Sequence, residues 1–226
     1  MQWVPLGAPL VGPGAISMFA ECAQGLALKA AGVPAAFVIS EPVVQRYWRP
    51  VFLFSETGMI QVGDKLPGGK LFEYIEVEGN GCSLGPNAFD VAQSVAGKTI
   101  AIFGLPGAFT PTCSAQHAPG YIAKAAAFQA VGVDEIWCVS VNDAFVMGAW
   151  GRELGAQGKV RMMADGSADF VKALGLTLDL NAKGLGLRAG RFSMLVKDGV
   201  VTHLNDEKGG GYAVSDADTL LAQAQG

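Results

Sequence analysis

The sequence predicts an α/β protein in which a central mixed sheet is flanked by helices. Short runs of β-branched and apolar residues alternate with longer stretches in which apolar residues recur at helical spacing, as in successive strand–helix–strand units. Near the end, Lys197-Asp198-Gly199 separates two strand-like runs, and an Asp-Gly pair in that position is a strong hairpin signal. The first pattern predicts parallel strands in the centre, and the second predicts an antiparallel edge.

The expected elements begin after Met59. We expect strands over residues 71–77, 99–103, 135–141, 160–163, 192–196 and 200–204. We expect helices over residues 87–95, 111–130, 143–154, 168–174 and 215–224. The last helix follows the hairpin directly.

Composition narrows the class of protein. The 226 residues are enough for one good-sized core, and the net charge of −4 argues against a nucleic-acid-binding surface. The four cysteines, Cys22, Cys82, Cys113 and Cys138, form no Cys-x-x-Cys pair and no metal-type spacing. This usage fits a reducing compartment in which thiols serve chemistry, so we expect a cytoplasmic protein that is not bound to a membrane.

One cysteine occupies a position that favours reactivity. In the stretch GLPGAFTPTCSAQH, the strand 99–103 ends, a Gly/Pro turn follows, and the helix 111–130 opens with Cys113 in its first turn. Unpaired amides at a helix start carry partial positive charge and stabilise a thiolate. Pro111 suits the first helical position and Thr110 is a natural N-cap. Cys113 is therefore a candidate nucleophile, the alternative being a small buried apolar residue.

These residues also resemble a known family. Pro106, Thr110 and Cys113 fit the pattern P-x-x-x-T-x-x-C, which is similar to the signature of peroxiredoxins. The string PGAFTPTCSAQHAPGY and the segments 140–150 and 184–199 resemble the type II, or peroxiredoxin-five-like, subfamily, in its bacterial glutathione-dependent form. The resemblance implies a thioredoxin fold with peroxiredoxin-type additions. It also implies a thiol-dependent peroxidase that reduces hydrogen peroxide and organic hydroperoxides.

The resemblance assigns roles to further residues. Cys113 would attack the peroxide and become a sulfenic acid, with the Thr110 hydroxyl and nearby amides as donors. Pro106 would shield the thiolate from water. By its match in the string RFSM, Arg191 would hold the thiolate charged, the alternative being an ordinary arginine at a strand end.

His117 lies four residues after Cys113, on the same face of the predicted helix. Three interpretations stay open for it: a partner of the thiolate, a metal ligand together with Cys113, and a packing residue. The family carries a histidine at this place, which implies a supporting role near the pocket.

The regeneration of the thiol has two solutions in the family. Cys138 matches a possible resolving cysteine of plant type II proteins, but a buried strand cysteine is the alternative we favour. Mammalian-type relatives carry a resolving cysteine at the position of Val214. We therefore expect a one-cysteine cycle with glutathione, glutaredoxin or thioredoxin as the reductant, no bound cofactor, and a homodimer. A peroxide sensor that passes its oxidation to a partner protein is a second functional hypothesis.

Residues 1–58 differ from the rest of the chain. They are rich in Pro, Gly and Ala, and prolines and charges interrupt every apolar run short of the roughly 20 residues that a membrane span needs. The string MIQVGD, starting at Met59, resembles a family N-terminus. We expect the domain to comprise residues 59–226 and residues 1–58 to be a poorly ordered extension from an over-extended start. A targeting segment or a genuine extension are the alternatives.

Overall fold

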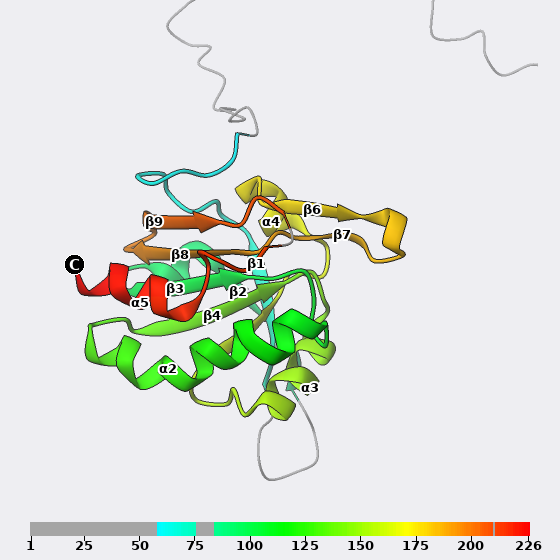
Figure 1. Cartoon of the computed structure of the whole chain (residues 1–226), viewed down its shortest axis with the longest axis horizontal. Coiled ribbons are helices and arrows are strands. Elements are labelled where there is room, and N and C mark those ends of the chain that lie inside the picture. Colours follow the sequence, from blue (N-terminus) through cyan, green and yellow to red (C-terminus); the bar gives the residue numbers. More distant parts are fainter. Residues whose placement is uncertain (1–57, 76–83, 210) are drawn as a thin grey trace, which may run out of the picture. The chain divides into compact units, whose positions relative to one another are not determined.

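The computed structural model describes residues 58–75, 84–209 and 211–226. Within them, a seven-stranded sheet runs in the order β2-β1-β5-β4-β3-β8-β9 (Figure 1). The strands are β1 (Lys70–Ile75), β2 (Leu84–Asp90), β3 (Thr99–Gly104), β4 (Glu135–Ser140), β5 (Arg161–Ala164), β8 (Phe192–Lys197) and β9 (Val200–Asp206). The prediction for residues 1–58 lies almost wholly outside the described residues, as do Cys22 and Cys82.

The sheet has a parallel centre and antiparallel edges. Strands β3, β4 and β5 pair in parallel, with Phe103 opposite Cys138 and Cys138 opposite Met162. Strands β8 and β9 continue the sheet antiparallel on one side, and β1 and β2 do so on the other. At the β8–β9 turn, Asp198 and Gly199 both have positive φ, as a tight hairpin requires. The expected central mixed sheet is confirmed.

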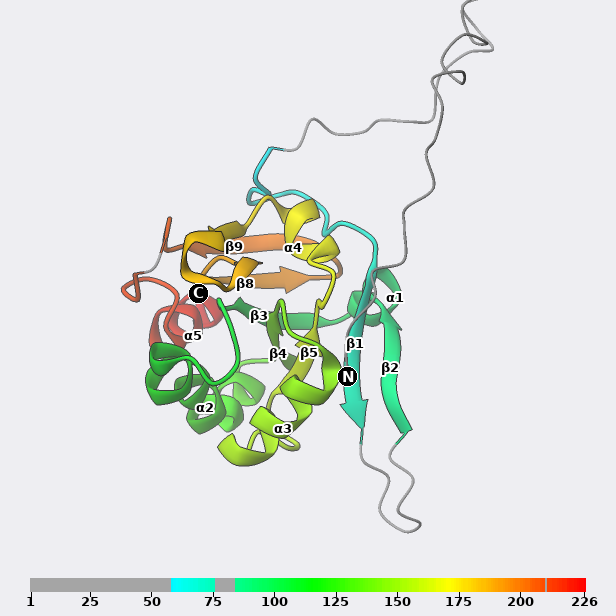
Figure 2. The same ribbon diagram turned by 90° about the vertical axis from the view of Figure 1, so that its right-hand side faces the viewer.

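Helices cover both faces of the sheet (Figure 1). Helices α2 (Ala118–Ala130), α3 (Ala144–Leu154) and α5 (Ala217–Gln225) lie on one face, and α4 (Asp169–Leu174) lies on the other; α1 (Val91–Val95) packs into the same core as α4. Figure 2 shows the two layers with the strands between them. Side chains alternate along β3, so Ala101 and Phe103 pack under α2 while Ile100 and Ile102 pack on the α4 side. The two cores fix the sheet between the helices.

Two regions differ from the sequence prediction. The helix expected over 87–95 is wrong, because residues 84–90 form β2 and only Val91–Val95 are helical. Pairing with β1 determines this conformation, with Phe72 opposite Ala88 in the antiparallel register. The hairpin of β6 (Thr177–Leu180) and β7 (Gly186–Ala189) was not predicted. Its strands are only four residues long and pair with each other in a separate small sheet. Such short strands have too little alternation of apolar and polar residues to be predicted from the sequence.

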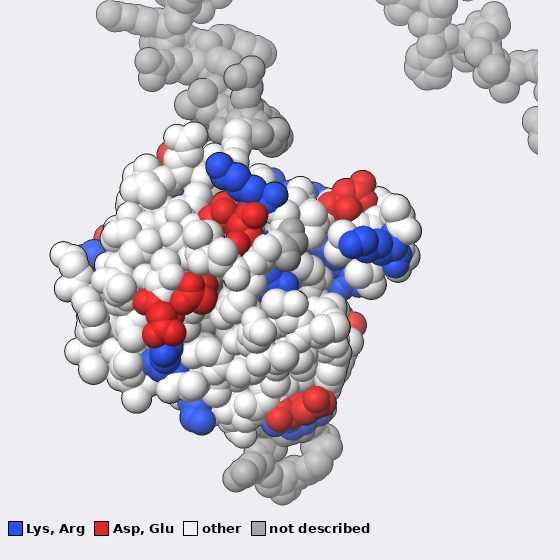
Figure 3. Space-filling model, viewed as in Figure 1, with Lys and Arg blue, Asp and Glu red and all other residues white. Residues whose placement is uncertain are grey.

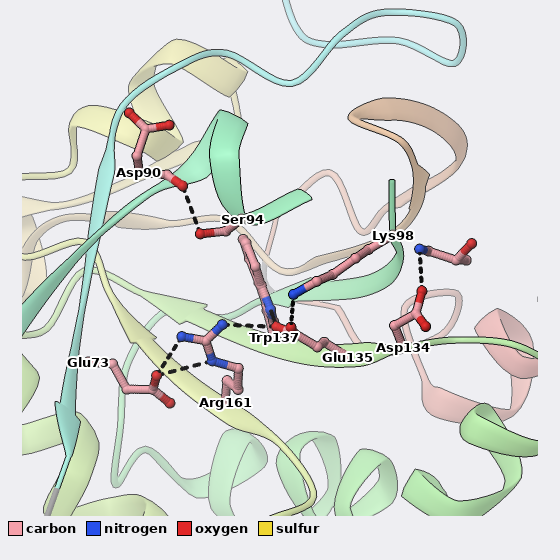
Figure 4. Close-up of polar contacts among 9 residues, drawn as sticks. Glu73, Asp90, Ser94, Lys98, Asp134, Glu135, Trp137 and Arg161 are labelled. Carbon is pink, nitrogen blue, oxygen red and sulfur yellow. Dashed lines mark hydrogen bonds and ion pairs between the residues drawn. The ribbon is translucent and has the colours of Figure 1, made fainter. Parts of the chain in front are cut away.

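A charged network ties the strands together where β4 and β5 begin (Figure 4). The Arg161 guanidinium donates to Glu73 of β1 and to Glu135 of β4, and Lys98 and Trp137 also donate to Glu135. Burial opposes the ionisation of Glu135, but the hydrogen bonds from Lys98, Trp137 and Arg161 outweigh it and lower its pKa to about 2. This network lies at the opposite end of the parallel strands from the residues that follow β3.

The charged side chains form small mixed groups on the face shown in Figure 3, separated by uncharged surface. Because both signs of charge are mixed, this face does not present the large field of one sign that would attract a highly charged partner. Among the described residues, no helix is long and apolar enough to cross a membrane.

Candidate active site

The end of β3 positions the turn that precedes the candidate nucleophile. Gly104, the last residue of β3, pairs with Phe192, the first residue of β8. A Cβ atom at Gly104 would come within 2.1 Å of the Phe192 ring, so only glycine fits this close approach. The contact brings the residue before Phe192, which is Arg191, to the start of the following helix.

The helix after this turn begins as the sequence predicts, with one difference in its cap. The Thr110 carbonyl accepts a hydrogen bond from the Ser114 amide at 3.0 Å, which places Thr110 at the N-cap. Its hydroxyl, however, donates to the Gly107 carbonyl at 2.8 Å and does not cap the helix. The amides of Thr112 and Cys113 belong to the first turn, where a helix leaves N–H groups without intrahelical partners.

The predicted helix 111–130 is present, but it contains one wide turn. Residues Cys113–His117 form a π-turn, in which the Ala118 amide donates to the Cys113 carbonyl, and α2 continues from Ala118. Both Cys113 and His117 are fully buried. Single π-turns inside helices occur frequently at functional sites, and the sequence carries no signal that predicts this one.

Arg191 places a buried positive charge against the thiol. Its side chain is only 4% exposed, and Nη1 and Nη2 each lie 3.5 Å from the Cys113 sulfur. Nη1 also lies 3.0 Å from Nδ1 of His117. Among the described residues, the Nε–H of Arg191 has no hydrogen-bond partner. The guanidinium is therefore aimed at the sulfur and keeps one donor for a further acceptor.

His117 connects Arg191 to the C-terminal part of the chain. Its Nε2 lies 3.1 Å from the Ser215 carbonyl, which can only accept, so Nε2 carries the proton and Nδ1 accepts from Arg191. Burial and the neighbouring charge of Arg191 lower the pKa of His117 to about 3, so the ring is neutral at physiological pH. This geometry is none of the three interpretations as stated: His117 accepts from Arg191 and orients the side chain that contacts Cys113, which fits the supporting role implied by the family resemblance. The described residues contain no group of three or more side chains that could hold a metal ion.

Cys138 lies behind the site in the sheet. It is fully buried in β4 and belongs to the same apolar core as Cys113. Burial, with the negative charge of a Cys113 thiolate adding to it, raises the pKa of Cys138 well above its ordinary value. Both cysteines are free thiols. Pro106 lies half-buried in the turn, and Val214 is exposed.

Two residues that hold the turn were not recognised from the sequence. Asp143 caps α3 by accepting from the Val146 amide, whereas the neighbouring Asn142 does not cap the helix. The Asn142 side-chain oxygen instead accepts from the Ala108 amide at 3.0 Å and so fixes the turn to the end of β4. Arg188 is half-buried and donates to the carbonyls of Val141 and Leu185, with its guanidinium beside Gly107.

Comparison with known proteins identifies the family. The family model described as Redoxin matches residues 61–221. Peroxiredoxin-2B of Arabidopsis thaliana is 47% identical over 162 residues, which span 72% of this chain and 96% of that protein. The chain belongs to the peroxiredoxin family. Its members reduce peroxides with a thiol, so the protein is a thiol-dependent peroxidase, and the resemblance in the sequence is confirmed at this level.

Solved structures confirm the thioredoxin fold of this peroxiredoxin. Reduced Prx3 from Vibrio vulnificus in complex with H2O2 is 45% identical, with a TM-score of 0.68 over 74% of this chain and 99% of that one. A Burkholderia cenocepacia protein provisionally named a thioredoxin reductase is 62% identical, with a TM-score of 0.70 over 73% and 98% of the two chains. That name belongs to the relative; the present sequence contains no Cys-x-x-Cys pair.

Proposed function

We propose that this peroxiredoxin reduces hydrogen peroxide and organic hydroperoxides at Cys113, and that glutathione, directly or through glutaredoxin, restores the thiol. The observation that carries the proposal is the pair of 3.5 Å contacts from Arg191 to the Cys113 sulfur. A guanidinium cannot lose its proton in a protein, so a buried one stabilises the thiolate over the thiol. A thiolate is the form of cysteine that attacks a peroxide.

The reaction at the site consists of one displacement. The Cys113 thiolate attacks one peroxide oxygen, the O–O bond breaks, and the leaving oxygen departs with the electron pair and a proton as water or an alcohol. The first-turn amides of Thr112 and Cys113 and the free Nε–H of Arg191 supply donors for the oxygen that becomes negative. The Thr110 hydroxyl donates its hydrogen bond to the Gly107 carbonyl, so the lone pairs of the hydroxyl oxygen are left to accept from the substrate O–H. Pro106 shields the sulfur.

The sulfenic acid that remains needs a second thiol. Cys138 is fully buried in a central strand, and its raised pKa keeps it protonated and poorly nucleophilic. To reach Cys113 it would need the start of the active-site helix to unwind, which costs stability. An external thiol needs access to the sulfur, which is buried in the reduced protein, but it does not need a cysteine to leave the central strand. Glutathione condenses with the sulfenic acid to a mixed disulfide and water, and a second thiol then releases the Cys113 thiol.

A two-cysteine cycle is the second candidate. Cys138 and Cys113 share one apolar core, so a local opening of the helix would bring them together. Treating the reduced protein with one equivalent of peroxide in the presence of glutathione separates the two cycles by intact mass. We expect one added glutathionyl group, with full turnover retained in Cys138→Ser. A Cys113–Cys138 disulfide, together with an inactive Cys138→Ser, would replace the one-cysteine cycle by the two-cysteine one.

The reductant is tested by comparing glutathione, glutaredoxin and thioredoxin at equal protein concentration. We expect turnover with glutathione and faster turnover with added glutaredoxin. Turnover with thioredoxin alone would contradict the proposed reductant. Rapid oxidation of Cys113 without turnover by any of the three would favour the sensor hypothesis, in which a partner protein receives the oxidation.

We also propose a cytoplasmic homodimer that needs no bound cofactor. Two large apolar side chains lie exposed near the site, Phe109 at 51% and Phe145 at 55%. Their rings contact Trp150 and Tyr74 at one edge and leave apolar surface for a second copy. Sedimentation should show a dimer that Phe145→Glu dissociates. A wild-type monomer at micromolar concentration would refute the dimer without affecting the chemistry.

A further inference from the structure

Glu207, which the mechanism does not use, organises the segment before the last helix. It follows β9, and one of its carboxylate oxygens accepts four hydrogen bonds of 2.8 Å each. The donors are the backbone amides of Ala213, Val214 and Ser215 and the Ser215 hydroxyl. A single oxygen with four donors fixes this short segment more tightly than backbone pairing alone.

The segment held by Glu207 contacts the active site through two residues, Ser215 and Tyr212. The Ser215 carbonyl accepts from Nε2 of His117 at 3.1 Å and from the Tyr121 hydroxyl at 2.9 Å. The ring of Tyr212 lies 5.2 Å from the His117 ring, and the Arg191 guanidinium lies 5.8 Å from the centre of the Tyr212 ring. Both the histidine and the arginine therefore depend on where this segment lies.

Glu207 also contacts Arg191 through the backbone. Its amide donates to the Arg191 carbonyl at 3.0 Å, so the two residues are neighbours across the β8–β9 pair. The main chain of Glu207 fixes the main chain of Arg191, and its side chain fixes the carbonyl that orients His117. The contacts form one continuous chain from the carboxylate to the sulfur.

Building on the proposed function, we propose that Glu207 is a positioning residue for the peroxide-reactive thiol. It acts through the Ser215 carbonyl, which keeps the proton on Nε2 of His117 and leaves Nδ1 free to accept from Arg191. Without Glu207, the carbonyl loses its fixed place and the proton of His117 is free to move to Nδ1. An N–H at Nδ1 would oppose the Arg191 donor and turn the guanidinium away from Cys113.

The property that matters is an accepting oxygen. Burial alone would raise the pKa of Glu207, but the amides of Val214, Ala213 and Ser215 outweigh burial and lower it to about 2. The carboxylate therefore stays ionised at physiological pH and does not act as a switch. A glutamine offers an amide oxygen of the same reach, whereas an alanine offers none, so Glu207→Gln is the conservative variant.

The test compares Glu207→Ala, Glu207→Gln and Asp90→Ala. Asp90 caps α1 far from the site by accepting from the Gln93 amide, so its variant controls for lost stability. Two quantities are measured on the full chain. The first is the single-turnover rate of Cys113 oxidation by hydrogen peroxide. The second is the absorbance midpoint, the pH at which half of the absorbance change due to the Cys113 thiolate has occurred. Residues that orient metal ligands through a hydrogen bond typically contribute about 10–100-fold to affinity or activity, and we take the lower end of that range for Glu207.

For Glu207→Ala we expect a fall in rate of about tenfold and a rise of the absorbance midpoint by about one pH unit, because one unit corresponds to a tenfold change. Glu207→Gln should restore most of both, and Asp90→Ala should change neither. An unchanged midpoint in Glu207→Ala, or an equal loss in Asp90→Ala, would overturn the positioning role.

If Glu207→Ala does not fold, Glu207→Asp takes its place, because its shorter side chain keeps the charge but does not reach all the donors. Cys113→Ser distinguishes the two proposals. Peroxide oxidation that persists in Cys113→Ser would contradict the proposed function itself, whereas loss of oxidation in Cys113→Ser with unchanged Glu207 variants would contradict the positioning role alone.

Discussion

Replacement of Arg191 tests how the thiolate is stabilised. The side chain is buried and makes two contacts of 3.5 Å with the Cys113 sulfur. A hydrogen bond to a charged group contributes about 1.5–3 kcal/mol, and the long distance to sulfur favours the lower end, so the pair contributes about 3 kcal/mol. Since about 1.4 kcal/mol corresponds to a tenfold change in rate, Arg191→Met should oxidise about 150-fold more slowly. Arg191→Lys keeps the charge but loses one of the two donors, which predicts a loss of about tenfold.

The assay is a single turnover, so it does not depend on the reductant. Reduced protein is mixed with hydrogen peroxide, quenched at intervals with an alkylating reagent, and the remaining Cys113 thiol is measured by mass. Arg161→Met is the control, because Arg161 is a half-buried, ion-paired arginine that lies at the far end of the parallel strands. We expect Arg161→Met to lower the melting temperature and leave the rate unchanged. A rate close to wild type in Arg191→Met would refute the reasoning.

Three further predictions concern stability. Gly104→Ala places a Cβ 2.1 Å from the Phe192 ring, so the folded state should lose about 1–3 kcal/mol in denaturant titrations, and an unchanged unfolding midpoint would contradict this packing. His117 has a pKa of about 3 in the folded state and 6.5 in the unfolded state, so the unfolded chain binds the extra proton and the free energy of unfolding falls as pH drops from 6.5 towards 3. His117→Asn should flatten this dependence of stability on pH. The same slope in His117→Asn and wild type would be inconsistent with a buried neutral ring. Glu135 has a pKa of about 2 when folded against 4.5 when unfolded, so its contribution is present above 4.5 and is lost as pH falls towards 2. Glu135→Gln should therefore differ from wild type more at neutral than at acidic pH, and a constant difference would exclude this ionisation as the cause.

The sequence predicted the features that local signals determine. The strand before Gly104, the Gly/Pro turn and the helix after Thr110 each carry their own propensity and capping residues, and all three are confirmed. The Asp-Gly hairpin is confirmed for the same reason. The helix expected over 87–95 was wrong because pairing with β1, a non-local interaction, decides the conformation of β2.

The candidate site also combines features that have a local signal in the sequence with features that depend on contacts between distant residues. Cys113 and the N-cap role of Thr110 follow from the helix start, which the sequence displays. The contact of Arg191 with Cys113 joins residues 78 positions apart, and the contact of His117 with Ser215 joins residues 98 positions apart. Arg191 was found only through the family resemblance, and Glu207 had no signal, because its function depends on a folded segment that brings three amides to one oxygen.

Trapping the sulfenic acid tests the central claim most directly. The reduced protein is exposed to one equivalent of hydrogen peroxide in the presence of dimedone, a reagent specific for sulfenic acids, and the labelled peptide is identified by mass. We predict that the label lies on Cys113 and that Cys113→Ser carries none, while Cys138→Ser is labelled like wild type. A label on Cys138 or on any other cysteine, or peroxide consumption that persists in Cys113→Ser, would contradict Cys113 as the residue that reduces the peroxide.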